Sequence, residues 1–83
     1  MVTHTLLITR EVANEIVQGN RLFDFRPANK KIRKGHILKY VVVENQKRLL
    51  HTIEEYSFMV TYVDTPPQLH EGVEVIGFRR IAR

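Results

Sequence analysis

Three charged residues, Arg21, Asp24 and Arg26, are spaced so that they can act on one ligand. Asp24 and Arg26 lie two positions apart in a β-prone stretch, Leu22–Arg26, which places both side chains on one strand face. Their separation along the strand is about 6 to 7 Å. A carboxylate there can accept a hydrogen bond from the exocyclic amine of a base, and a guanidinium can bind a phosphate or a guanine edge. Arg21 adds a fixed positive charge that can hold phosphate.

The same residues also allow a purely structural interpretation. Asp24 and Arg26 can pair with each other, or with neighbours, to neutralise a partly buried strand face without any ligand. In the functional interpretation, Asp24 could also serve as a general base for a water molecule. The sequence leaves these alternatives open.

Positive charge is concentrated in the segment that follows. No acidic residue occurs between Asp24 and Glu44, whereas this interval holds six Lys and Arg residues as well as His36. A second basic group occupies positions 79, 80 and 83. Such a surface can bind phosphates through counterion release, or it can be a solvated loop. The candidate ligand-binding residues are Arg21, Asp24, Arg26, Lys30, Lys31, Arg33, Lys34 and Tyr40.

The aromatic residues divide into two groups. The phenylalanines at positions 23, 25, 58 and 78 stand in apolar alternation and are predicted to lie in the core. Tyr40, Tyr56 and Tyr62 carry a polar tip and are the candidates to stack on an unpaired base, with packing in the core or at its rim as the alternative. Tyr40 is therefore included in the candidate site.

Short elements separated by strong breakers must position these residues. Thr9 is a predicted cap for a helix over Arg10–Gln18, and Gly19 is its predicted left-handed stop. The pattern predicts one α+β domain over residues 1–83, in which one early helix is followed by four or five strands and the sheet closes into a small mixed β-barrel; a plain sandwich is the alternative. The predicted strands are Thr3–Ile8, Leu22–Arg26, Ile37–Glu44, Leu49–Ile53, Ser57–Asp64 and Val73–Ile81, with a turn over Asn45–Arg48.

Length and composition exclude several classes of protein. Eighty-three residues allow a single core, and the absence of cysteine excludes disulfides, zinc ribbons, thiol nucleophiles and iron–sulfur sites. A short chain without cysteine is typical of a reducing compartment, so we expect a cytoplasmic protein. No apolar stretch approaches the roughly 18 residues that span a membrane. The four histidines lack metal-ligand spacing, and we expect neither a metal nor another cofactor.

The residues Gly19, Arg21, Asp24 and Arg26 together resemble the Gly-x-Lys-x-x-Glu-x-Arg signature of ASCH domains, the activating signal cointegrator homology family, which is related to the PUA fold. The resemblance implies a β-barrel with flanking helices. It also implies a cleft where the signature, the basic loop and neighbouring strands meet, with RNA or a modified nucleoside as ligand.

Later segments continue this resemblance. Lys34–Leu38 is similar to the family's Val-Gly-Asp-x-Ile step into a long strand, Met59–Val63 to its Val-x-Tyr-Val strand, and Val73–Phe78 to its closing strand. Residues 3–6 and 23–26 resemble a branch of small bacterial and phage proteins. His36 stands where the family has Asp, which makes the mouth of the implied cleft more basic.

One ASCH branch removes an acyl group from N-acetylated cytidine, using a Lys, a Thr and a Glu. Here Arg21 replaces that Lys and no Thr follows within the signature. Because arginine does not exchange protons near neutrality, hydrolysis is disfavoured. It stays open with Asp24 as base and Glu54, Glu55 or Glu74 as second carboxylate. The sequence therefore predicts an RNA- or nucleoside-binding module, with an amidohydrolase or a protein-interaction module, such as a homodimer, as alternatives.

Overall fold

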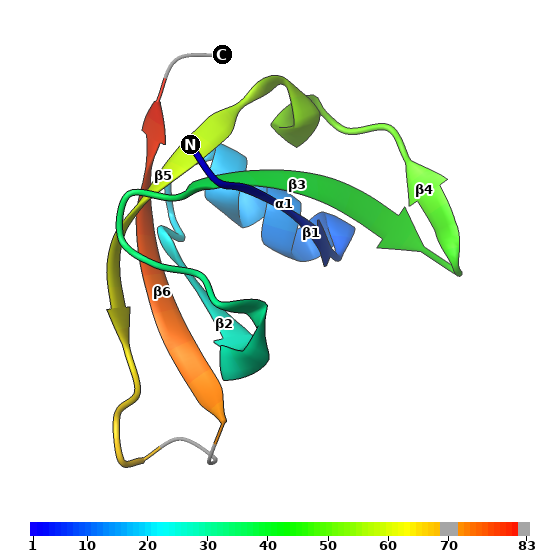
Figure 1. Ribbon diagram of the computed structural model, residues 1–83. Helices are drawn as coiled ribbons and strands as arrows, with labels where there is room; N and C mark the ends of the chain where they lie inside the picture. Colours follow the sequence, from blue (N-terminus) through cyan, green and yellow to red (C-terminus); the bar gives the residue numbers. More distant parts are fainter. Residues whose placement is uncertain (69–71, 82–83) are drawn as a thin grey trace.

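The computed structural model describes residues 1–68 and 72–81 of the chain (Figure 1). One α-helix, α1, is accompanied by strands and two short 3₁₀ helices, η1 and η2. The α+β class predicted from the sequence is confirmed. Within the described residues no helix has the length and apolar character needed to cross a bilayer. The elements in chain order are β1 (Thr3–Ile8), α1 (Arg10–Val17), β2 (Phe23–Pro27), η1 (Ala28–Lys30), β3 (Ile37–Glu44), β4 (Lys47–Leu49), η2 (Thr52–Glu55), β5 (Ser57–Asp64) and β6 (Val73–Ile81).

The strands form one strongly curved, mixed sheet (Figure 1). Its order is β1-β3-β5-β6-β2, and β4 pairs with β3 off this path. β1 and β3 are parallel, and the helix and β2 between them in the chain supply the long connection that parallel pairing requires; the other pairs are antiparallel. Among the described residues no backbone ladder joins β1 to β2, so the sheet is not closed into the predicted barrel. The side chain of Arg26 bridges these two strands instead.

Both ends of α1 follow the prediction from the sequence. The Thr9 side chain accepts a hydrogen bond from the N–H of Val12 at 3.3 Å. At the other end, Gly19 has a φ of 81° and donates its N–H to Ile16, while the next residue donates to Glu15. This pair of bonds is a Schellman motif, which requires the left-handed backbone that glycine adopts without strain.

The region between β3 and β5 differs from the prediction. Asn45 and Gln46 have φ angles of 52° and 66°, as in the two-residue type I′ turn that joins two antiparallel strands. The strand predicted over Leu49–Ile53 is wrong, because β4 ends at its first residue and the chain then forms η2. The side chain of His51 caps this turn by accepting the N–H of Ile53 at 3.0 Å. The turn buries Ile53 completely.

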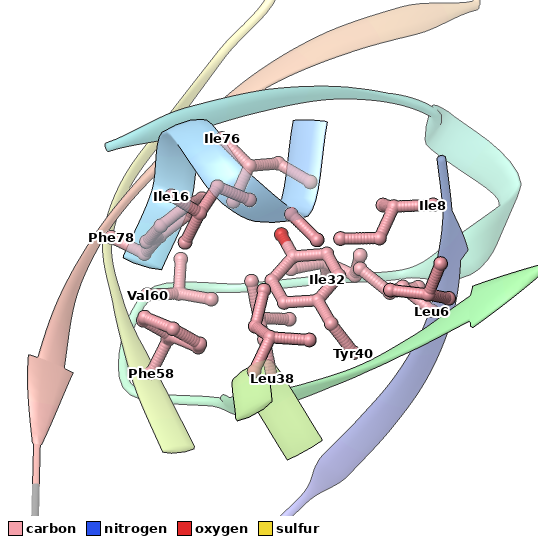
Figure 2. Close-up of a cluster of buried hydrophobic side chains, with 13 residues drawn as sticks. Leu6, Ile8, Ile16, Ile32, Leu38, Tyr40, Phe58, Val60, Ile76 and Phe78 are labelled. Carbon is pink, nitrogen blue, oxygen red and sulfur yellow. The ribbon is translucent and has the colours of Figure 1, made fainter. Parts of the chain in front are cut away.

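A hydrophobic core lies between the curved sheet and α1 (Figure 2). At its centre the rings of Tyr40, Phe58 and Phe78 contact one another, with centroids 5.2 to 6.0 Å apart. The helix adds Ala13 and Ile16 to the cluster. The prediction that Phe58 and Phe78 are core residues is confirmed.

The same prediction is wrong for the two phenylalanines of β2. Phe23 is 43% exposed and Phe25 is 45% exposed, whereas Asp24 between them is only 5% exposed. Because side chains alternate along a strand, the inward direction of Asp24 forces both rings outward. The hydrogen bonds that hold Asp24 inside therefore decide which face of β2 is buried.

Candidate functional site

Asp24 is the one charged residue that is buried within the described part of the chain, and four hydrogen bonds converge on its carboxylate. Oδ1 accepts from Arg21 Nη2 at 3.2 Å and from the N–H of Phe25 at 2.9 Å. Oδ2 accepts from Arg26 Nε at 2.9 Å and from the Tyr40 hydroxyl at 3.2 Å. A carboxylate offers about four lone-pair positions. The protein's own donors therefore occupy the acceptor positions that a base amine or a catalytic water would need.

Arg26 ties the two end strands of the sheet together. Its Nε bonds to Asp24 in its own strand, and its Nη2 donates to the carbonyl of Leu7 in β1 at 2.9 Å. The side chain is 17% exposed, so little of the guanidinium faces solvent. These contacts correspond to the structural interpretation of the Asp24–Arg26 pair.

Arg21 is the most accessible member of the signature. It leaves the turn at Gly19, donates from Nε to the carbonyl of Phe23 at 2.9 Å and pairs with Asp24. Its Cζ lies 5.0 Å from the centroid of the Phe23 ring, a cation–π arrangement. Its side chain is 26% exposed, so part of the guanidinium remains available on the surface.

Tyr40 does not line a cleft. Its side chain is 1% exposed, and Figure 2 shows its hydroxyl oxygen amid the buried cluster. Burial, together with the nearby carboxylate of Asp24, raises the pKa of Tyr40 far above its usual value of 10.0, so the hydroxyl stays protonated and donates to Asp24. The prediction that Tyr40 contacts a ligand is corrected, because a buried ring offers no face to a base. Tyr40 is a core residue that positions Asp24.

The basic loop between η1 and β3 is anchored by one apolar side chain. Ile32 is completely buried, while Lys30, Lys31, Arg33 and Lys34 around it are exposed. Within the described residues, none of these four cations forms an ion pair, and no hydrogen bond joins them to Arg21, Asp24 or Arg26. The structure thus supplies an accessible positive surface. It does not bring this surface into contact with the signature.

Two of the histidines meet at the start of the parallel strands β1 and β3. His4 Nε2 and His36 Nδ1 are 2.9 Å apart, and His36 Nδ1 also accepts the N–H of Arg33 at 3.2 Å. Burial, followed by the proximity of His36 and of Lys30, lowers the pKa of His4 below 6.5. The described residues contain no cluster of three or more potential metal ligands. His70 lies outside the described residues, as does Arg83.

The carboxylates considered as partners of Asp24 are dispersed. Glu54 pairs with Arg48, and Glu55 is exposed in η2. Glu74 lies opposite Arg26 in the β2–β6 register, and its Oε1 is buried with no hydrogen-bond partner among the described residues. None of the three bonds to Asp24 in that part of the chain. No pair of cooperating carboxylates is therefore assembled there.

A groove of about 380 Å³ lies beside the turn that ends α1. Arg79 and Arg80 of β6 form one side, and neither has an ion-pair partner within the described residues. Arg80 Cζ is 4.7 Å from the centroid of the Tyr56 ring, and Arg79 Nη2 is 3.9 Å from Met59 Sδ. The groove thus combines apolar side chains with two arginines. Its lining consists of Ile16, Val17, Gln18, Gly19, Leu22, Phe58, Arg79 and Arg80.

A second groove, of about 320 Å³, has the opposite chemical character. Its lining is Leu50, His51, Thr52, Glu54 and Glu55, so it carries two carboxylates and no Lys or Arg. A polyanion is expected to bind the first groove in preference to this one.

The first groove could not be predicted from the sequence, for a topological reason. Gly19 and the basic group at the end of the sequence are both recognisable there, but no local signal places them together. β2 pairs with β6, so the residues that follow Gly19 lie beside Arg79 and Arg80 although about sixty positions separate them. The sequence feature that points to this groove is the second basic group, because the pairing of β2 with β6 places Arg79 and Arg80 beside the residues that lead into β2.

None of the protein-family models compared with this chain matches it, and neither does any of the curated proteins. The similarity to ASCH domains therefore stays a prediction based on the signature residues.

Proposed function

We propose that this protein binds RNA or a nucleoside-containing ligand, and that the groove beside Gly19 is its binding site. The observation that carries the proposal is the position of Arg79 and Arg80 along an apolar groove, each with no acidic partner among the described residues. A guanidinium binds phosphate oxygens through paired, charge-assisted hydrogen bonds. Leu22, an apolar lining residue that is 48% exposed, can contact the face of a base or a ribose.

The ASCH-like signature has a positioning role in this proposal. The contacts of Asp24 with Arg21 and Arg26 hold β2 in place, and Leu22 immediately before β2 forms part of the groove. The exposed cations Lys30, Lys31, Arg33 and Lys34 add a general attraction for phosphate without sequence preference. A PUA-like relationship and a cytoplasmic location belong to the same proposal. They are supported by the signature and by the absence of cysteine.

Binding of a fluorescently labelled single-stranded RNA, measured by anisotropy, tests this function. Arg79→Ala and Arg80→Ala are each expected to weaken binding about tenfold or more, since a hydrogen bond to a charged group contributes about 1.5 to 3 kcal/mol. Arg10→Ala is the matched control, because it removes the same charge from the other end of α1, where Arg10 pairs with Glu44. Equal losses in all three variants, or no binding by the unmodified protein, would contradict the proposal.

The basic loop provides a separate measurement. Arg33→Ala and Lys34→Ala are expected to weaken binding evenly across RNA sequences. Each should reduce the slope of log affinity against log salt by roughly 0.7, the value for one lost contact with a single strand. An unchanged slope would show that the loop is solvated in the complex and would confine the binding site to the groove.

We place the two alternative functions predicted from the sequence, hydrolysis and protein interaction, below RNA binding. Hydrolysis of N-acetylated cytidine needs a free base, and the four hydrogen bonds to Asp24 leave that carboxylate engaged. Release of acetate by the unmodified protein, abolished in Asp24→Asn with the fold retained, would reverse this ranking. A homodimer or another protein-interaction role would be indicated by a concentration-dependent mass in the absence of RNA binding.

A further inference from the structure

The outer face of the sheet carries three aromatic side chains that the core does not use. On this face Phe23 of β2 pairs with Gly77 of β6, which in turn pairs with Tyr62 of β5. The next row contains Phe25, opposite Val75. The rings of Phe23, Phe25 and Tyr62 are 43%, 45% and 48% exposed. Phe23 and Phe25 stand on β2, with ring centroids 5.7 Å apart, and Tyr62 stands on β5, on the other side of β6. We call these three side chains the aromatic face.

Gly77 makes room for the tyrosine ring. A Cβ atom at this position would lie 2.9 Å from Cδ1 of Tyr62, which is closer than such atoms approach each other in proteins. The ring of Tyr62 therefore lies against the bare backbone of β6. Glycine inside a strand commonly marks such a close approach. Phe23 and Tyr62 thus stand on either side of Gly77, on strands about 10 Å apart at two strand spacings, and the Tyr62 ring leans over the Gly77 backbone.

The charges around the aromatic face are unevenly placed. Arg21 lies over the Phe23 ring, and Arg79 follows Gly77 by two positions on the same face of β6, next to Met59. The opposite end carries Asp64, which accepts a hydrogen bond from the Tyr62 hydroxyl at 3.4 Å. A phosphate backbone would be attracted to the arginine end and repelled from the Asp64 end.

We infer that the aromatic face stacks unpaired bases, with Phe23 and Tyr62 as the stacking residues and the phosphate backbone running past Arg21 and Arg79. This inference rests on the proposed function and narrows the ligand to a single strand. Bases of a duplex are already stacked on one another, whereas a single strand can place its bases on exposed aromatic rings. Arg79 is common to both surfaces, because it also lines the groove.

A polyanion fits this face better than a second copy of the chain. The net charge of the protein is +4, so two copies repel each other overall, and Arg21 and Arg79 add positive charge locally. A single-stranded nucleic acid gains both from these charges and from the rings.

The test compares three probes of equal length: a single-stranded RNA, the same backbone without bases, and an RNA duplex. Phe23→Leu and Tyr62→Leu keep an apolar side chain but remove the ring. Each is expected to weaken binding of the single-stranded RNA about fivefold to a hundredfold, the range found for loss of one stacked base. Binding of the base-free backbone should be unchanged, because only the phosphate contacts remain there. Leu50→Ala is the control, because it removes an 84% exposed apolar side chain that is not part of this face, and it should bind as the unmodified protein does.

Gly77→Ala offers a second variant in which every ring is retained. The added methyl group displaces the Tyr62 ring, and we expect a smaller loss of affinity that is again restricted to RNA with bases. Circular dichroism of each variant reports whether the fold is kept. Since Tyr62 is half-exposed, its ring can move aside without repacking of the core.

The outcomes separate this inference from the proposed function. If Arg79→Ala weakens RNA binding while Phe23→Leu and Tyr62→Leu do not, the aromatic face is excluded as a stacking surface and the groove proposal stands. Equal loss with the base-free backbone also overturns stacking. If the unmodified protein binds no probe, both fail. If the leucine variants change only the oligomeric mass, the face is a contact between copies and the inference is wrong.

Discussion

In β2 the buried face carries charged side chains and the exposed face carries apolar ones, the reverse of the usual arrangement in a strand. The inner face presents Asp24 and Arg26 to the interior, and the outer face presents Phe23 and Phe25 to solvent. Full burial of a phenylalanine contributes about 1.5 to 3 kcal/mol, and each of these rings forgoes a sizeable part of that stabilisation. Buried charge is tolerated on the inner face because every acceptor position of Asp24 has a donor.

The difference shows that charge alone does not identify a binding residue. The charged residues of this strand hold the fold together, while its apolar residues are the ones available to a partner. Each of the following experiments tests one side of this contrast.

Asp24→Ala should give the largest effect. It leaves Arg21, Arg26 and the Tyr40 hydroxyl without their shared acceptor, and we expect the free energy of unfolding to fall by about 3 to 5 kcal/mol. Urea denaturation followed by circular dichroism measures this loss. Tyr40→Phe, which removes one of the four hydrogen bonds, should cost about 1 kcal/mol. A midpoint for Asp24→Ala equal to that of the unmodified protein would show that the network does not hold β2.

Gly19→Val tests the turn that leads into β2. A β-branched residue is strained at the φ of 81° found here, so the variant should lose about 1 kcal/mol or more in thermal or urea denaturation. Gly19→Asn is the matched control and should lose less, because asparagine tolerates this backbone conformation. Similar stability of the valine and asparagine variants would mean that the turn does not require a left-handed residue.

Substitution of His4 tests a second half-buried polar contact, the one between His4 and His36. Because burial and the nearby His36 and Lys30 lower the pKa of His4 below 6.5, the unfolded chain takes up a proton before the folded one does. The contribution of His4 to stability is therefore complete above about pH 7, declines as the pH falls below 6.5 and levels off beneath its lowered pKa. His4→Gln should show a shallower fall in unfolding free energy between about pH 7 and pH 5. An identical pH profile for both proteins would exclude this role.

Phe25→Ser should give the smallest effect on stability. Its ring is 45% exposed, so it retains about half of the stabilisation of a fully buried ring, and the loss should be about 1 kcal/mol. The same change in the core, Phe58→Ser, should cost several times more. Comparable losses at the two positions, measured by urea denaturation, would show that the outer face contributes to the fold as the inner face does.

Regular elements of this fold could be predicted from local sequence. The bounds of β1, β3, β5 and β6 follow from β-prone runs between strong breakers, and Thr9 and Gly19 mark the ends of α1 through hydrogen bonds with near neighbours. These signals depend on near neighbours in the chain. For these elements the tertiary contacts agree with the local preference. η2 could not be predicted in this way, because its formation depends on the burial of Ile53 beneath distant parts of the chain.

The candidate site was less predictable because its parts meet only through strand pairing. Alternation along β2 gives two faces but does not say which one is buried. That choice depends on donors from Tyr40 and Arg21, which the sequence does not place near Asp24. Tyr40 was assigned to a cleft for its polar hydroxyl, and this hydroxyl is used inside the core. The groove likewise combines Gly19 with Arg79, which only the β2–β6 pairing brings together.

We expect the bond from Arg26 to the Leu7 carbonyl also to hinder aggregation through the ends of the sheet. β1 and β2 are the ends of the sheet's strand order, and an end strand with free backbone groups can be extended by a strand from another molecule. Here a charged guanidinium occupies a carbonyl of β1, so an incoming strand would have to displace Arg26 and strip Asp24 of a partner. The same arginine that joins the two ends of the sheet thereby opposes edge-to-edge polymerisation.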